Sequence, residues 1–396
     1  MISAQETHRG LSKKRKPMAS IYLHIPYCEK KCIYCDFYSI ENMNSMERFL
    51  DALEKEIAMY SAKFSTRDTF ETIFFGGGTP SLLPASIIER ILASLHSCYR
   101  IDPDAEITVE TNPGTVDFEK LREYRSRGVN RLSIGIQSFH PDELAFLSRI
   151  HTADEAVECV QNARRAGFEN ISVDLIFSLP NQTPERWKEN LRRAIALQPN
   201  HISAYSLIVE EHTPLFTMVQ NKTVAPMPED SDAELYEATI GLMAQHGFAQ
   251  YEISNYAKPG FECRHNKNYW NHSNYLSFGP SAHSFWKERP TTGKRWWNVR
   301  SVAQYCDAIA KEGFPVAGSE IVNEEKMLSE AVFLGLRMGE LNAAMIQQLY
   351  GVDILSTQGE KLKGFSDEDL LHIKNRRITL TRKGLLVCDA IAESLV

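Results

Sequence analysis

The sequence has no apolar run long enough for a secretory signal or a membrane span. It also has no excess of positive charge, because 44 Lys and Arg residues stand against 51 Asp and Glu residues, a net charge of -7. Both signs are interspersed, so a general attraction to nucleic acid or to an anionic membrane is not expected. We therefore expect a cytoplasmic protein with no membrane span and no nucleic-acid partner.

Low-complexity tracts are absent as well. Hydrophobic residues make up 43% of the 396 residues, which is enough for one large domain with a smaller appendage. The one basic run, residues 13–16, lies in a polar stretch before Met18. This composition predicts a disordered tail over residues 1–19 and leaves open whether translation starts at Met1 or at Met18.

The distribution of the eight cysteines does not suggest a disulfide framework. Cys28, Cys32 and Cys35 crowd into eight residues, whereas the others are scattered singly at positions 98, 159, 263, 306 and 388. This pattern favours a reducing compartment and a metal site.

Short apolar runs rich in β-forming residues alternate with amphipathic stretches. Strands are expected at residues 21–26, 72–75, 107–110, 131–137, 171–177 and 201–207, and helices at 46–62, 84–95, 117–127, 153–166 and 184–196. Such alternation predicts an α/β fold with a parallel sheet, either doubly wound or an open or closed βα barrel.

Polar or glycine-containing segments follow these strands at their carboxyl ends. The three cysteines come after the first strand and the glycines of residues 76–80 after the second, while Glu110, Gln137 and Asp174 lie at or near the ends of later strands. Parallel α/β folds place their sites at this edge of the sheet. We therefore predict one site built from all of these segments.

The alternation fades after about residue 210. Residues 251–297 are dense in aromatic side chains and hold four of the five tryptophans. Helices are then expected at 325–336, 343–350 and 367–372, followed by a strand at 378–381 and a final helix. This order predicts a small winged-helix-like α domain, for which packing or a partner is favoured over DNA because no basic recognition helix is evident.

The spacing of the first cysteines is C-x3-C-x2-C. A loop of that length can wrap three thiolates round one face of an iron-sulfur cube and leave the fourth iron open, and no fourth cysteine follows at a matching interval. A structural zinc ion is the alternative, with His24 or a distant residue completing the four ligands.

This spacing, with aromatic Tyr34 before the last cysteine, resembles the radical SAM superfamily, and Phe75-Gly-Gly-Gly-Thr-Pro80 resembles that superfamily's second motif. The resemblance implies a [4Fe-4S] cluster held by Cys28, Cys32 and Cys35 and a bound S-adenosylmethionine (SAM). It also implies one-electron cleavage of the SAM sulfonium to a 5'-deoxyadenosyl radical, with an electron donor for the cluster.

Nearly the whole chain resembles the branch with oxygen-independent coproporphyrinogen III oxidase and the HemW haem chaperones. Residues 22–28, 107–113, 133–138 and 174–180 carry the likeness. It implies an open (β/α)6 partial TIM barrel as the radical SAM core. It also implies a set of residues that line SAM: Tyr22, Tyr34, Gly77, Gly78, Thr79, Glu110, Gln137, Arg149, Asp174 and Ile208.

Two features favour the chaperones over the oxidases. Phe37 stands where the oxidases have a further cysteine, two residues beyond the third ligand. In addition, His265-Asn-x-x-Tyr269-Trp270 matches the H-N-x-x-Y-W pattern of the HemW family, which implies a haem surface with His265, Tyr269 and Trp270 as contacts. Cys263 is interpreted as a bystander, and His272 and His283 as packed residues.

The sequence thus predicts a haem chaperone with a radical SAM core, which passes its haem cargo to a haemoprotein acceptor in respiration. The alternatives are an oxygen-independent coproporphyrinogen III dehydrogenase and, more remotely, a zinc-stabilised binding protein. The expected domains are a core at 20–250, an aromatic-rich haem-handling segment at 251–322 and the helical domain at 323–396.

Overall fold

The computed structural model describes residues 18–64 and 68–396. The disordered tail expected at residues 1–19 therefore lies outside the described residues, except for Met18 and Ala19, which begin the first strand. The question of the start codon also falls outside them.

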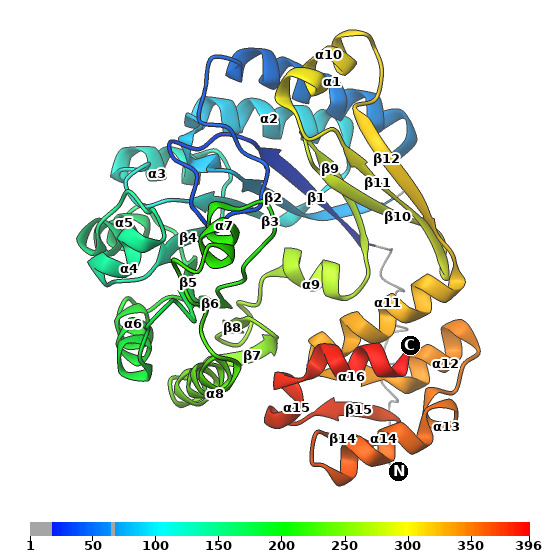
Figure 1. Cartoon of the computed structure of the whole chain (residues 1–396). Coiled ribbons are helices and arrows are strands. Elements are labelled where there is room, and N and C mark those ends of the chain that lie inside the picture. Colours follow the sequence, from blue (N-terminus) through cyan, green and yellow to red (C-terminus); the bar gives the residue numbers. More distant parts are fainter. Residues whose placement is uncertain (1–17, 65–67) are drawn as a thin grey trace, which may run out of the picture.

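The core is a parallel sheet whose strands alternate with helices (Figure 1). Its strands are β1 (Met18–Ile25), β2 (Thr69–Gly77), β3 (Ile101–Thr111), β4 (Arg131–Gln137), β5 (Asn170–Phe177) and β6 (His201–Ser206). Between them lie α1 (Met46–Phe64), α2 (Ala85–Cys98), α3 (Phe118–Ser126), α4 (Pro141–Phe146), α5 (Ala153–Arg165) and α6 (Pro184–Ala196). The α/β fold is confirmed, and α4 is the one helix here that the sequence analysis missed.

The sheet continues beyond both edges of this core. Its order is β12-β11-β10-β9-β1-β2-β3-β4-β5-β6-β8-β7, so the strands of the described chain form an open sheet, as a partial barrel requires. The added strands are β7 (Ala249–Glu252), β8 (Asn255–Ala257), β9 (Asn274–Phe278), β10 (His283–Arg289), β11 (Thr292–Asn298) and β12 (Val316–Val322). The aromatic-rich segment thus extends the core sheet instead of forming a sheet of its own.

Four helices accompany these outer strands. They are α7 (Pro214–Gln220), α8 (Glu229–Gln245), α9 (Arg264–Trp270) and α10 (Val302–Ala310). Helix α9 connects β8 at one side of the core to β9 at the other and contacts β1, β2 and β9 (Figure 1). It therefore brings residues far along the chain against the first strands.

The two faces of the core sheet differ in chemistry. On the helix-covered face the strands present apolar side chains, such as Leu132, Ile134 and Ile136 of β4, all fully buried. On the other face the same strand presents Arg131, Ser133 and Gln137, because side chains alternate along a strand. Buried polar groups need partners, so this polar lumen is suited to a polar ligand.

The C-terminal domain has its own apolar core and a small sheet of order β13-β15-β14. Its elements are α11 (Glu324–Arg337), β13 (Glu340–Asn342), α12 (Ala343–Tyr350), α13 (Ile354–Thr357), α14 (Gly359–Asp367), β14 (Leu371–Lys374), β15 (Arg377–Leu380), α15 (Arg382–Leu386) and α16 (Cys388–Leu395). Among the described residues no helix is both long and apolar enough to cross a membrane.

The helix expected at residues 367–372 is wrong. Helix α14 ends at Asp367, and Leu371 begins β14, where it pairs with Leu380 across a hairpin. The left-handed backbone of Asp369 (φ 58) turns the chain between the two elements. The apolar pair at 370 and 371 suggested a helix, but its partners lie on the neighbouring strand.

Candidate functional site

The loop after β1 is closed by backbone hydrogen bonds around the three clustered cysteines. Cys28 N donates to Ile40 O at 3.0 Å, and Ile40 N donates to Pro26 O at 2.8 Å. Cys28, Cys32 and Cys35 are free thiols, and all three line one cavity of about 670 Å³. The loop therefore turns its sulfurs toward one space.

The donor set fits an iron-sulfur cluster better than a single zinc ion. Three cysteines are the thiolate ligands that an iron-sulfur cluster uses, whereas structural zinc needs four ligands. His24, the expected extra zinc ligand, hydrogen-bonds the Tyr38 carbonyl at 2.8 Å and does not line the cavity.

Polar groups reach two of the three sulfurs. Thr79 Oγ1 donates to Cys28 Sγ at 3.5 Å, and Arg149 Nη1 donates to Cys32 Sγ at 3.6 Å. Hydrogen bonds and positive charge stabilise thiolates, the form in which cysteine binds iron. The three cysteines with these neighbours are therefore suited to hold an anionic cluster.

The glycines after β2 let the chain pass close to the cysteine loop. A Cβ on Gly78 would lie 2.6 Å from Tyr27 O and 2.9 Å from Ile25 O. Gly78 N donates to Ile25 O at 2.8 Å, and Gly77 adopts φ +111 while its N–H donates to Glu110. Only glycine fits these two positions without displacing the loop.

Most of the residues predicted to line SAM are brought together. Eight of them line the same cavity as the cysteines: Tyr34, Gly78, Thr79, Glu110, Gln137, Arg149, Asp174 and Ile208. The other two do not line it but contact residues that do, since the Gly77 N–H donates to Glu110 and the Tyr22 ring stacks on Phe74. These assignments are not tested by a bound ligand and stay predictions.

Two buried carboxyl groups face this cavity. Burial, followed by the nearby charge of Asp174, raises the pKa of Glu110 to about 8, while the Gly77 N–H and Arg131 act in the opposite direction. Burial also raises the pKa of Asp174, although it accepts hydrogen bonds from Ser203 (2.7 Å) and Ser133 (2.9 Å). Both carboxylates can accept further hydrogen bonds from an ammonium or from ribose hydroxyls.

Arg149 is fixed at the other side of the cavity. Its Nη2 donates to Asn112 Oδ1 at 2.6 Å and to Gly135 O at 2.8 Å, while Nη1 points to Cys32. A guanidinium held in this way is preorganised for a carboxylate. The cavity thus has acceptors on one wall and a cationic donor on another.

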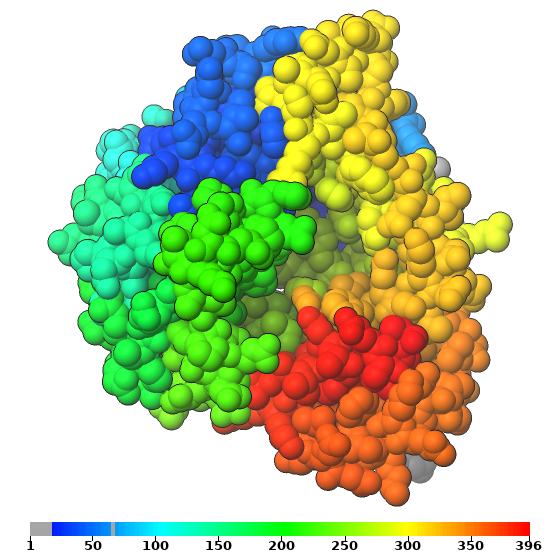
Figure 2. Space-filling model, in the orientation of Figure 1, coloured from blue at the N-terminus to red at the C-terminus, as the bar shows by residue number. Residues whose placement is uncertain are grey.

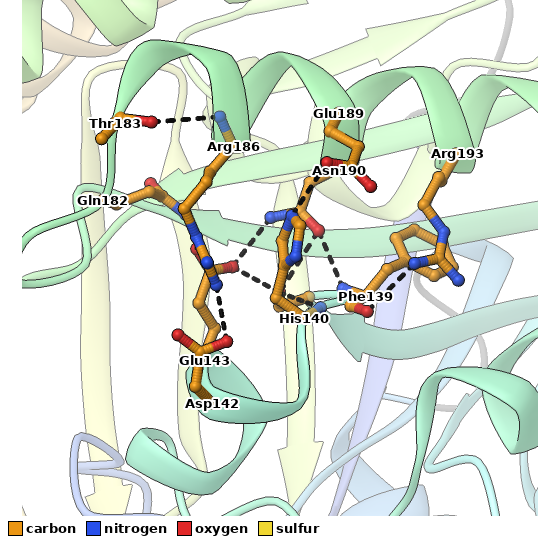
Figure 3. A network of polar contacts seen from close by, with 11 residues as sticks. Phe139, His140, Asp142, Glu143, Gln182, Thr183, Arg186, Glu189, Asn190 and Arg193 are labelled. Atoms are coloured by element: carbon orange, nitrogen blue, oxygen red, sulfur yellow. Dashed lines mark hydrogen bonds and ion pairs between the residues drawn. The ribbon is translucent and has the colours of Figure 1, made fainter.

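Gln137 ends β4 in a left-handed conformation (φ 66). Directly after it, Ser138 Oγ donates to Glu143 Oε2, and Phe139 N donates to Asn190 Oδ1 at 2.8 Å (Figure 3). The buried Glu143 carboxylate also accepts from Asn190 Nδ2 at 2.8 Å. This network joins α4 and α6 to the strand end and holds a conformation that a non-glycine residue rarely adopts.

Sequence reasoning missed several cavity residues, among them Arg131, His201 and Asn266. Arg131 is 1% exposed, and no hydrogen bond or ion pair joins its side chain to another described residue. The signal for Arg131 was present, because residues 131, 133, 135 and 137 alternate along one predicted strand and so share a face. Asn266 lies inside the H-N-x-x-Y-W motif itself.

The predicted haem contacts lie on α9 outside this cavity. His265 is 2% exposed, its Nδ1 lies 2.7 Å from Thr72 Oγ1, and its Nε2 lies 3.0 Å from the Tyr269 hydroxyl. Burial, with Arg131 as a second cause, lowers the pKa of His265 to about 3, so the ring is neutral. Both ring nitrogens are thus engaged in the described conformation, and the haem assignment stays a prediction.

The packed role expected for His272 and His283 holds for the first of them. His272 is 8% exposed and stacks on Phe285. His283 stacks on Trp297 but is exposed at the start of β10, so the expectation is wrong for this residue. Cys263 is fully buried with its Sγ 3.6 Å from Glu106, which agrees with a structural role.

Comparison with known proteins places these features in context. Residues 22–194 match the model of the Radical SAM superfamily, and residues 322–387 match the HemN C-terminal domain. The protein named "Heme chaperone HemW" from Bacillus subtilis is 37% identical over 94% of this chain and 98% of its own length. Its Mycobacterium tuberculosis namesake is 33% identical over 98% of this chain and 97% of its own length.

Among solved structures, coproporphyrinogen III oxidase (HemN) from Escherichia coli, described as a radical SAM enzyme, superposes with a TM-score of 0.81 at 24% identity. The match covers 96% of this chain and 90% of that chain. At this identity the likeness establishes a common fold and leaves the activity open.

Proposed function

The chain belongs to the HemW family of radical SAM proteins, and from that premise we propose that it binds haem and passes it to a haemoprotein acceptor. The observation that carries the proposal is the 37% identity to a protein named haem chaperone over 94% of this chain, which spans both the core and the C-terminal domain. The family resemblance predicted from the motifs is confirmed. The acceptor, which we propose to be respiratory, and the cytoplasmic location are part of the proposal.

The cofactors of this superfamily are a [4Fe-4S] cluster and SAM. We propose that Cys28, Cys32 and Cys35 hold the cluster, which when reduced by an electron donor supplies one electron to the sulfonium of SAM. Arg149 is suited to the SAM carboxylate, and Glu110 and Asp174 to its ammonium or ribose hydroxyls.

The haem-handling role is proposed for residues 251–322, between a core at 20–250 and a helical domain at 323–396. Within that segment His265, Tyr269 and Trp270 are the proposed haem contacts. For His265 to ligate iron, its Nε2 must exchange the Tyr269 hydroxyl for the metal, so α9 has to adjust when haem binds.

The test uses the full chain, with its cluster reconstituted without oxygen. Haem binding is measured by titration, and formation of protoporphyrinogen from coproporphyrinogen III is measured in parallel with SAM and a reductant. We expect stoichiometric haem binding and no porphyrinogen turnover, because Phe37 stands where the oxidases carry a further cysteine. Turnover would replace the chaperone with the dehydrogenase, whereas a zinc-loaded protein that resists reconstitution would refute the cluster.

A further inference from the structure

The cavity that holds the cysteines has two kinds of wall. Part of the wall is polar, with Arg131, Asp174 and Glu110, and another part is lined by apolar side chains from three segments. They are Tyr34 and Phe37 of the cysteine loop, Ile176 of β5, and Leu207 and Ile208 after β6. We call these five residues the apolar border. A polar ligand alone would not need them, so they indicate a second ligand with an apolar surface.

Part of the apolar border is fixed by packing against a buried cluster. Tyr34 and Leu207 pack against a small buried cluster that contains Ile176 and Leu179. The cysteine loop and the segment after β6 are also joined directly, since Leu215 N donates to Ile33 O at 3.0 Å. In Figure 2 the green segment with α7 lies against the dark blue of this loop, beside a hollow in the surface.

Phe37 and Ile208 do not belong to this buried cluster, and each side chain is 65% exposed. Of the large apolar side chains in the described ranges, only Ile321, on the outer strand β12, is more exposed, at 75%. Exposed apolar side chains that gather at a cavity mark a binding surface more often than isolated ones do.

Charge at this border is uneven. Lys30 and Lys31 line the cavity on the cysteine-loop side, and neither amine forms an ion pair within the described chain. The nearby Asp36 is already paired with Arg300 at 2.9 Å, while Glu210 lies on the opposite segment. The rim therefore offers two unpaired cations beside an apolar surface.

We propose that this rim, Phe37 and Ile208 with Lys30 and Lys31, is a docking site for haem in front of the SAM cavity. The proposal rests on the chaperone function proposed above and names a haem site distinct from α9. Haem is flat and apolar and carries two carboxylates along one edge, so its ring matches the two exposed apolar side chains and its carboxylates match the lysines. The whole cavity, of about 670 Å³ including this rim, has the size of a single small-molecule site, so SAM among the polar side chains leaves haem only the mouth.

One consequence separates this site from one on α9. Haem at the mouth covers the way into the lumen, so bound haem should slow the release of SAM. SAM and haem then act on each other at the mouth, where Ile208 belongs to both proposed contact sets, and this gives a chaperone a use for its SAM cavity.

The test measures haem affinity by absorbance titration of the reconstituted full chain and of variants. Burial of one large apolar side chain is worth roughly a tenfold change in affinity or more, so Phe37→Ala and Ile208→Ala should each raise the haem Kd about tenfold. Ile321→Ala is the matched control and should leave the Kd unchanged. Lys30→Gln with Lys31→Gln should weaken haem but not haem dimethyl ester.

The outcomes distinguish the two proposals. If the wild-type chain binds no haem, the chaperone function fails and the site falls with it. If the wild type binds haem and the Phe37 and Ile208 variants bind as tightly as Ile321→Ala, the rim is refuted while the function stands. If His265→Ala alone abolishes binding with the cluster intact, the site lies on α9. Cluster content and circular dichroism of each variant establish that it is folded.

Discussion

Ser138 Oγ donates a hydrogen bond to Glu143 Oε2 at 2.5 Å, one residue after Gln137 takes its left-handed turn. Glu143 lies on α4 and also accepts from Gln182 Nε2 and Arg186 Nε, so helix, strand end and the loop after β5 meet at one buried carboxylate. Ser138, the last residue of the motif at 133–138, therefore has a structural role in holding this strand end. The sequence did not indicate that Glu143 is its hydrogen-bond partner.

Glu143→Ala is expected to weaken SAM binding through Gln137. Removing the carboxylate leaves Asn190 Nδ2 and Gln182 Nε2 without their acceptor, which should lower the free energy of unfolding by about 2–4 kcal/mol. Gln137 then loses its enforced conformation, and we expect the SAM Kd, measured by equilibrium dialysis, to rise about tenfold. Asp142→Asn, which removes only the exposed partner of Arg186, is the control. An unchanged SAM Kd in a folded Glu143→Ala protein would contradict this role.

Gly78→Ala is expected to displace the cysteine loop. The new Cβ would lie 2.6 Å from Tyr27 O and 2.9 Å from Ile25 O. Both are backbone atoms, so neither can move away by rotation of a side chain. Overpacking of this kind costs about 1–3 kcal/mol, and the local shift should reduce the iron and sulfide bound per chain after reconstitution.

Gly241→Ala on α8 is the matched control for that substitution. Nothing lies within 4 Å of its added Cβ, and alanine in a helix interior is favoured by about 1 kcal/mol over glycine. Full cluster content in Gly78→Ala would show that the close approach does not position the loop.

Glu56 makes the stability of the fold depend on pH. It is fully buried on α1 and accepts hydrogen bonds from Gly279 N, Asn298 Nδ2 and the Tyr305 hydroxyl. Burial raises its pKa from 4.5 to about 7, and these hydrogen bonds oppose the shift. The folded state therefore binds a proton that the unfolded state has lost between these pH values, so this group's contribution to stability falls as pH rises through that window.

Glu56→Gln should remove this dependence. From pH 4 to pH 8 the wild type is expected to lose about 3 kcal/mol of unfolding free energy relative to the variant. Denaturant unfolding of both chains at the two pH values measures it. The same difference at both pH values would mean that folding does not raise the pKa of Glu56.

Local patterns predicted the parts of the fold that depend on neighbouring residues. Strand β4 was predicted with its observed bounds because Leu132, Ile134 and Ile136 alternate with polar residues. The pairing of β9 with β1 was not predictable, because Tyr275 and Ser20 are far apart in the chain and no local pattern encodes their contact.

The same distinction holds for the site. The cysteines and glycines were found because spacing along the chain carries their chemistry. The sequence did not predict that both ring nitrogens of His265 are already engaged. One contact is with Thr72, 193 residues away, and the other is with the Tyr269 hydroxyl, whose direction the motif does not fix. The motifs therefore predicted which residues belong to the site, but the burial of a residue such as His265 depends on tertiary packing.

SAM binding should require ionised Glu110 and therefore strengthen as pH rises toward 8. Burial and Asp174 raise the pKa of Glu110 to about 8, whereas the Gly77 N–H and the cation of Arg131 favour the carboxylate. Replacing Arg131 by Met removes that cation, so Glu110 stays protonated to a higher pH and cannot accept a charge-assisted hydrogen bond from the SAM ammonium. SAM Kd measured from pH 6 to pH 9 should fall with pH in the wild type, and Arg131→Met should move the fall to higher pH. Arg131→Lys keeps the charge and should restore the wild-type profile. A profile that is flat in all three chains would mean that Glu110 is already ionised at pH 6 and that Arg131 serves another charge.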